Sequence, residues 1–397
     1  MRGFHFYHGH RASLHFSDFW LYEISMWLHT LARSLVAIFI PILMLKSGYD
    51  IVSVVLYFLI FNTINVPLNF VARTFVRKIG ARFSIAVGTC VSIGFFWLFL
   101  HMTTPTMPLL FALAALAAVY DALYWVAHFY LFIESGGGSK QAGKSTGAMY
   151  AVRQTGIIFG PAAGAAILIF VSQNVLLYIT IGGLLLSLVP LLWLGGLPDR
   201  PRHRVLPYKE FFALPEGKRT YLSSAFYAVH DAVESDLFPI FIFLIFGTLE
   251  SVAVIPVLIS VAAIVTALLL GSIKPARRNV AIISGALAIA AIWFVRLLAG
   301  DPTIYYISIL IISVCAYFVL VPLDSNIYEY GERIQDPLSA STYRNIAHMF
   351  THVLLFGTLM LLFNVFEPSF AIATVSLLAL GVIHLIPARF LFRRNPR

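Results

Sequence analysis

The chain has 397 residues, of which 60% are hydrophobic and 11% are charged, and its formal net charge is +9. This composition lies far outside that of soluble globular proteins, so the chain is expected to be a polytopic membrane protein. Its two cysteines, Cys90 and Cys315, both fall inside expected membrane spans, so no disulfide framework is expected.

The expected membrane spans follow a polar tail. Residues 1–18 are basic and contain His5, His8, His10 and His15, and no cleavable signal is expected there. Close histidines can bind a metal, but a basic tail near the lipid headgroups is the favoured interpretation. A membrane helix needs about 20 largely apolar residues. Twelve stretches meet this requirement, at residues 19–45, 51–72, 82–101, 107–133, 147–171, 174–195, 219–247, 250–272, 278–299, 303–325, 341–364 and 369–391.

The distribution of positive charge predicts the topology. The 27 Lys and Arg residues lie in the N-terminus, the even-numbered loops, the adjoining helix ends and the C-terminus, except for Arg33, Lys46 and Arg296. Because basic residues accumulate in cytoplasmic loops, both termini are expected to be cytoplasmic, in a plasma or inner membrane. The even number of spans agrees with this topology. The same distribution argues against nucleic acid as a partner.

The first and the fourth spans contain several ionisable side chains away from their ends. The first span contains Glu23, His29 and Arg33, and the fourth contains Tyr120, Asp121, Tyr124, Trp125 and His128. A charged group in lipid costs several kcal/mol unless it is paired or faces water. Apart from Trp125, each of these residues is therefore a candidate for function.

The loop after the fourth span contains a nucleotide-binding pattern. Gly138, Gly143, Lys144 and Ser145 satisfy the pattern GxxxxGK[ST]. That motif holds phosphate when a strand precedes it and a helix follows. Here a membrane helix precedes it, so we expect a basic cytoplasmic loop and no cofactor.

The fifth span contains glycines at a regular spacing. Gly147 is followed by Gly156, by Gly160 with Pro161, and by Gly164. The last three glycines are four residues apart and share one helix face, which allows the backbone of a neighbouring helix to approach closely. Pro161 removes a backbone donor and is expected to bend the helix.

This spacing resembles the antiporter motif in the fifth helix of the major facilitator superfamily, which occurs mostly in drug:proton antiporters and other exporters. Ala165 stands where that family usually has glycine. The turn containing Gly80 and Arg82 resembles the Gly- and Arg-rich loop of the same superfamily, with Arg77 in place of its usual acidic residue. The gating salt bridge of that acidic residue is therefore in doubt here, and the family's arginine motif is missing from the fourth span.

The resemblance implies an all-α fold of twelve transmembrane helices in two parallel six-helix pseudo-repeats. The expected parts are an N-terminal half at 1–196, a cytoplasmic loop at 197–218 and a C-terminal half at 219–397. The substrate site would lie between the halves at mid-membrane, lined by helices one, four, seven and ten. The fifth helix would pack on the eighth.

An internal repeat supports the two halves. With an offset of 201 residues, His29 aligns with His230 and Arg33 aligns with Glu234. Arg153 of the fifth span corresponds approximately to Arg344 of the eleventh. We therefore expect Arg33 and Glu234 to face each other across the cavity as a pair that opens and closes.

The seventh span adds further acidic candidates. His230, Asp231 and Glu234 are expected to share one face, with Asp236 pointing elsewhere. Asp121 is expected to couple transport to protons, because a carboxylate in a partly desolvated cavity can bind and release protons near neutral pH. Asp324, near the end of the tenth span, is given less weight. The alternative for these charges is a set of fixed ion pairs that join helices.

These observations predict a secondary transporter that moves a small solute by alternating access, with proton-coupled export favoured. Its expected partners are the solute, protons and membrane lipids, and a monomer is expected. A metal or cation transporter is the alternative, although His348 and His352 are expected to hydrogen bond in a helix interface. A membrane enzyme or scaffold is less favoured, because the sequence contains no nucleophile–base set and no metal-protease motif.

Overall fold

The computed structural model describes residues 16–102, 104–134, 142–193, 200–201, 205–362 and 364–391, and these residues form helices without any strand. The histidine-rich tail and Gly138 lie outside the described residues. The helices that precede the central linker are α1 (Phe16–Ser34), α2 (Ile40–Lys46), α3 (Ile51–Lys78), α4 (Ala81–Leu100), α5 (Met107–Phe132), α6 (Ala142–Phe170) and α7 (Gln173–Leu192). Those from the linker onward are α8 (Tyr208–Phe211), α9 (Pro215–Ala232), α10 (Phe238–Phe246), α11 (Leu249–Gly271), α12 (Arg278–Leu298), α13 (Pro302–Arg333), α14 (Pro337–Met360), α15 (Phe366–Leu385) and α16 (Ala388–Leu391).

All twelve expected spans are helical. Within the described residues, ten segments are long and apolar enough to cross a membrane. The two expected spans outside these ten are α9–α10 and α14, which carry ionisable side chains such as Asp231, Glu234 and Arg344. These two polar segments pack against each other.

Several helices end at positions that differ from the expected ones. α3 and α13 continue to Lys78 and Arg333, beyond the expected ends at 72 and 325, because each helix runs past its apolar stretch. Their last turns are basic, which suits the negative end of the helix dipole. The last span ends at Leu385, short of the expected 391, because Pro387 interrupts the helix.

Two spans are irregular at their centres. The first span is broken after Ser34, where a short 3-10 turn at Ala37–Phe39 leads into α2. The seventh span contains a π-helical turn at Val233–Leu237 between α9 and α10. Such turns are rare and occur often at functional sites. Here both irregular segments lie beside charged residues, since Arg33 precedes the first and Glu234 lies within the second.

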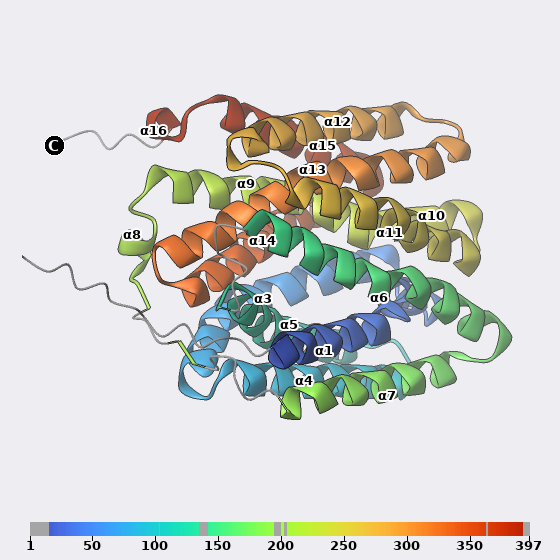
Figure 1. Ribbon diagram of the computed structural model, residues 1–397. Helices are drawn as coiled ribbons and strands as arrows, with labels where there is room; N and C mark the ends of the chain where they lie inside the picture. The colour runs from blue at the N-terminus through green and yellow to red at the C-terminus, as the bar shows by residue number, and fades with distance from the viewer. Residues whose placement is uncertain are drawn as a thin grey trace, which may run out of the picture.

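The two six-helix halves lie side by side in Figure 1, with α4 and α7 on one side of the bundle and α12 and α15 on the other. The halves meet most extensively between α6 and α11 and between α3 and α14. The linker helix α8 and the C-terminal α16 lie at the same end of the bundle in Figure 1. We call this the α8 end.

The glycines of α6 serve two neighbouring helices. A Cβ on Gly143 would lie 2.8 Å from the carbonyl oxygen of Gly271 in α11, and a Cβ on Gly147 would lie 3.1 Å from the Gly271 Cα atom. This confirms that the fifth helix packs on the eighth. The expectation that Gly160 and Gly164 face the eighth helix is wrong, because both face the first span, at Ser34 and Leu35.

The glycine face itself is as expected, although its partner differs. A Cβ on Gly156 would lie 3.3 Å from the carbonyl oxygen of Trp27 in α1, and one on Gly160 would lie 2.7 Å from the Ser34 Cβ atom. Pro161 follows Gly160 inside the helix and is buried. The three glycines therefore hold α6 against the broken first span, while Gly143 and Gly147 hold it against the other half.

Packed aromatic residues lie toward both ends of the bundle. Toward the α8 end, Phe132 of α5 and Tyr328 of α13 have ring centroids 5.2 Å apart, and both are buried. Phe211 of α8 belongs to the same hydrophobic cluster. Toward the opposite end, Phe58 of α3 stacks on Phe356 of α14 with a centroid distance of 5.1 Å. Contacts between the halves thus occur on both sides of the bundle centre.

Candidate functional site

A cavity of about 190 Å³ lies between the two halves. Helices α5, α6, α9, α13 and α14 contribute to its wall, so both halves form it. We call it the central cavity, and its lining residues are Asp121, Trp125, Phe129, Tyr150, Arg153, Tyr227, Asp231, Leu320, Arg344, Asn345, His348 and Met349.

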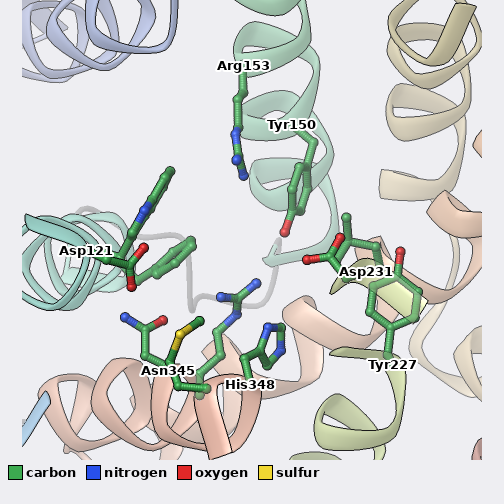
Figure 2. Close-up of a pocket in the computed structure, with 12 residues that line it drawn as sticks. Asp121, Tyr150, Arg153, Tyr227, Asp231, Asn345 and His348 are labelled. Atoms are coloured by element: carbon green, nitrogen blue, oxygen red, sulfur yellow. The ribbon is translucent and has the colours of Figure 1, made fainter. Parts of the chain in front are cut away.

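Four charged residues of the central cavity come from four different helices: Asp121 from α5, Arg153 from α6, Asp231 from α9 and Arg344 from α14. Figure 2 shows the guanidinium of Arg153 and the carboxylates of Asp121 and Asp231 pointing into the same space. Arg153 and Arg344, the two arginines expected to correspond between the halves, therefore line one cavity. Two of the expected acids line it with them.

A second cavity of about 180 Å³ shares Asp121 with the central cavity. Arg33, Tyr57, Tyr120 and Asp236 also line it. Asp121 is the only one of their lining residues that the two cavities have in common, and it accepts a 2.8 Å hydrogen bond from the Asn65 side chain. Asp121 is therefore accessible from both cavities.

Arg33 and Glu234 do not meet, which overturns the expected pair. Glu234 instead binds Arg296 of α12, with 2.5 Å between Oε2 and Nη1. In a regular α-helix two residues three apart lie only about 60° from each other, but the π-helical turn that begins at Val233 changes the winding between Asp231 and Glu234. Glu234 faces α12 and Asp231 faces the central cavity. The expectation that these two acids share one face is therefore wrong.

His230 belongs to the same buried group as Glu234. Its Nδ1 atom accepts a 3.0 Å hydrogen bond from the Trp293 indole, and the Trp293 ring lies beneath the Arg296 guanidinium at 4.4 Å. Arg296 also donates a 2.7 Å hydrogen bond to Ser308. His230 and Glu234 thus join α9 and the π-helical turn to α12 and α13, and neither lines the central or the second cavity.

Arg33 faces the second cavity. Its guanidinium donates a 3.1 Å hydrogen bond to Ser92 and lies 4.1 Å from the centroid of the Tyr120 ring. The Tyr120 hydroxyl is 2.9 Å from Nε2 of His29, and His29 stacks on Tyr124 with a centroid distance of 4.0 Å. The two tyrosines and His29 therefore form a wall beside Arg33. No carboxylate of the described residues pairs with Arg33.

His128 and Glu23 lie nearer the start of α1. The hydroxyl of Tyr22 is 2.8 Å from Nδ1 of His128, which fastens α1 to α5. Glu23 is 4% exposed, and neither carboxylate oxygen has a hydrogen-bond partner in the described part of the chain. A buried carboxylate without a donor is costly when charged. Glu23 and His128 line neither cavity, so the structure separates them from Asp121.

Asp324 contributes more to the site than its expected position near the end of the tenth span indicated. It binds the Arg344 guanidinium through two hydrogen bonds of 2.9 and 2.8 Å, and it also accepts a hydrogen bond from Tyr150 of α6. An arginine in a membrane span is costly unless it is paired or faces water, and this cost was the available signal. Tyr150, Tyr227 and Asn345 were also missed, because uncharged polar residues carry no comparable signal in sequence.

His348 and His352 have hydrogen-bond partners on neighbouring helices. His348 Nε2 is 2.7 Å from the Ser224 hydroxyl of α9, and His352 lies 3.2 Å from Asn62 of α3 and 3.0 Å from the carbonyl oxygen of Ala228. Among the described residues, no group of three or more His, Cys, Asp or Glu side chains is arranged to hold a metal ion. Both histidines therefore act in helix interfaces, as expected.

The turn between α3 and α4 is short and requires glycine. Gly80 has a φ of +124°, a region that side-chain-bearing residues rarely adopt, and α4 begins at the next residue. Arg82 lies in the first turn of α4, and Arg200 of the linker donates a 3.4 Å hydrogen bond to the Ile79 carbonyl. In the nucleotide-binding pattern, Gly143, Lys144 and Ser145 lie inside α6, and α5 is the preceding element.

The fold and site together define a class of protein: a helical membrane protein in which two six-helix halves enclose a charged cavity. The sequence matches the family model of the Major Facilitator Superfamily over residues 23–332. The chain belongs to the major facilitator superfamily, and it is an integral membrane protein that transports small molecules. Among curated proteins, none matches the sequence.

A solved structure supports the fold. The crystal structure of the human organic anion transporter MFSD10 (TETRAN) is similar to this chain with a TM-score of 0.67 and 12% sequence identity. The similarity covers 93% of this chain and 99% of that one. At this level of identity the comparison describes the fold and not the solute.

Proposed function

We propose that this protein moves a small polar solute through the central cavity by alternating access, exporting it in exchange for protons. The observation that carries the proposal is the set of charges contributed to one cavity by both halves: Asp121 and Arg153 from one, Asp231 and Arg344 from the other. Charged groups at this depth are costly unless they bind one another or a ligand.

The moving parts would be the two halves, 1–196 and 219–397, with residues 197–218 as the connection. The close contacts of Gly143 with Gly271 and of Phe58 with Phe356 lie on opposite sides of the cavity. Parting one contact while the other holds would open the cavity to one side of the membrane at a time. The linker would follow the second half, because the Leu206 amide donates a 2.7 Å hydrogen bond to Asp336.

Asp121 is the residue that we propose for proton coupling. It faces both cavities, and its carboxylate accepts a hydrogen bond from Asn65 of α3. A proton bound there would change the charge of both cavities at once. We further propose that both termini are cytoplasmic in a plasma or inner membrane, and that the protein acts as a monomer.

Reconstitution tests the proposed function. Purified protein would first be screened by thermal shift against a broad solute library, and a stabilising solute would then be loaded into proteoliposomes. We expect labelled external solute to exchange for the internal solute, and a proton gradient to drive its accumulation. Stabilisation without any exchange across the membrane would contradict transport. Exchange that ignores the proton gradient would contradict proton coupling alone.

Cation transport is the second candidate, because Asp121, Asp231 and Asp236 place three carboxylates on the cavity walls. A divalent or monovalent cation would stabilise the purified protein in the same screen, in the absence of any organic solute. The arginines of the cavities, Arg33 and Arg153, weigh against this candidate.

A further inference from the structure

We infer that the solute of the central cavity is a small zwitterion, whose anionic group binds at Arg153 and whose cationic group binds at Asp231. This inference rests on the proposed function and specifies the class of solute. It follows from the opposite charges of the cavity wall, from their lack of partners and from the size of the cavity.

The two charges are present without partners of their own. Arg153 lies 4.9 Å from the centroid of the Trp125 ring and has neither an ion pair nor a hydrogen bond with any described residue. The carboxylate of Asp231 likewise has no hydrogen bond or ion pair among the described residues. The residue is exposed and lines the cavity. By contrast, Arg344 is bound by Asp324 and Asp121 is bound by Asn65.

An anion is favoured on the Arg153 side of the cavity. Asn345 is 4% exposed, and its Nδ2 atom is a buried donor without an acceptor in the described structure. Figure 2 shows the Asn345 amide next to Asp121 and apart from the Arg153 guanidinium. Buried donors without acceptors are rare, because each costs the free energy of a lost hydrogen bond. A carboxylate of the solute would compensate the Arg153 charge, and a further acceptor of the solute would satisfy the Asn345 amide.

A cation is favoured on the Asp231 side. The aromatic residues Tyr150 and Tyr227 lie beside Asp231 on the cavity wall, as Figure 2 shows. Ammonium groups bind favourably to carboxylates and to the faces of aromatic rings. A solute with a single charge would leave either Arg153 or Asp231 without a counter-charge, in a cavity where an isolated charge is costly. A zwitterion compensates both.

The cavity limits the size of the solute. The volume of the central cavity is about 190 Å³. A cavity of this volume suits a molecule of amino-acid size better than a large amphiphilic drug. The class of solute is therefore a small molecule that carries one amine and one carboxylate.

A matched series of probes tests the inference. Alanine, leucine and 4-aminobutyrate are zwitterions, their N-acetyl derivatives are anions, and their carboxamides are cations. We expect at least one zwitterion to bind the purified protein at least about tenfold more tightly than both of its blocked derivatives, because each blocked form loses a charge-assisted contact. A blocked derivative that binds as tightly as its parent would overturn the inference.

Two variants assign the ends of the solute. Arg153→Gln should remove the preference for the zwitterion over its carboxamide and keep the preference over its N-acetyl form. Asp231→Asn should do the reverse. Glu250→Gln, at an exposed position at the start of α11, is the control and should keep both preferences. Loss of both preferences in each variant would show a general disturbance of the cavity and would count against the two assigned ends.

The experiment separates this inference from the proposed function. If another class of solute is exchanged by proteoliposomes while no zwitterion binds, the inference is wrong and transport stands. If zwitterions bind with the expected pattern but are never exchanged, the site is correct and the transport function is wrong.

Discussion

Glu234 and Arg296 form an ion pair inside the second half, with 2.5 Å between Oε2 and Nη1 and with the Arg296 side chain fully buried. The Phe238 ring lies 3.8 Å from the Arg296 guanidinium, and Ser308 accepts the hydrogen bond of its Nε atom. The buried guanidinium is therefore surrounded by protein groups. The pair joins the π-helical turn to α12 and α13, and it is separate from the central and second cavities.

The first prediction is that this pair stabilises the fold. Glu234→Gln or Arg296→Gln should each lower the free energy of unfolding by about 3–5 kcal/mol, because the remaining charge stays buried without a partner. Arg33→Gln should lower it far less, since Arg33 faces a cavity. A double-mutant cycle on thermal stability measures the coupling. Additive effects of Glu234→Gln and Arg296→Gln would show that the residues do not interact.

The pair also shows where inference from sequence succeeds and where it stops. Hydropathy and the distribution of Lys and Arg were sufficient for the twelve spans, because lipid selects strongly on both. Arg296 was recognisable as one of three basic residues outside the basic loops. The pairing of Arg296 with Glu234 was not recognisable. Whether Glu234 meets Arg33 or Arg296 depends on the rotation of the seventh span and on how α12 packs beside it.

The candidate site was predictable to a similar extent. Asp121, Arg153, Asp231 and Arg344 were found because ionisable residues are rare in membrane spans. Asn345 and Tyr227 carry no charge, and nothing in the sequence distinguishes them from other polar residues of the same helices. The side of α6 on which each glycine acts was predicted only in part, because one helix face can serve two neighbours along its length.

The second prediction concerns the glycines of α6. Gly160→Val should impair transport with the protein still inserted, because a side chain would displace Ser34 of the first span and overpacking costs about 1–3 kcal/mol. Gly147→Val should act through α11 instead. Gly182→Val of α7 is the control, since nothing lies within 4 Å of a Cβ there. Normal transport by both α6 variants would mean that close packing is not required.

The third prediction concerns topology. In a background without Cys90 and Cys315, cysteines at Asp50, Glu250 and Glu367 should react with an impermeant reagent from outside sealed cells. Cysteines at Arg77, Lys209 and Lys274 should not react until the cells are opened. All six positions are exposed, so accessibility does not limit the reaction. Labelling of the second set in sealed cells would reverse the proposed orientation.

The fourth prediction concerns the N-cap of α3, which lies outside the expected spans. Hydrogen bonds from the Ser53 side chain and backbone lower the pKa of Asp50, and the backbone bond is 2.8 Å long. A carboxylate with a lowered pKa in the folded state stabilises it above the unfolded pKa of about 3.9, and this contribution is lost as the pH falls through the folded value.

Two substitutions at Asp50 separate capping from titration. Asp50→Ala should lower thermal stability near neutral pH by about 0.5–1 kcal/mol, because the cap is lost. Asp50→Asn should retain capping, and the difference between it and the native protein should shrink or reverse below about pH 4. Stability would be followed by thermal unfolding in detergent at several pH values. A difference that stays constant with pH would show that Asp50 does not titrate as part of the cap.

The last prediction concerns Asp121, which is shared by the central and second cavities. Asp121→Asn keeps the size of the side chain and removes its charge, so it should abolish accumulation driven by a proton gradient while solute exchange continues in part. Asn65→Ala removes the hydrogen bond to Asp121 and should shift the pH dependence of exchange without abolishing it. Asp236→Asn is the matched control, because it neutralises an acid that lines only the second cavity and should leave coupling in place.

An Asp121→Asn protein that still accumulates solute in response to a proton gradient would remove Asp121 from the coupling role. In that case Glu23 would be the next residue to test, because its buried carboxyl group has no hydrogen-bond partner in the described structure.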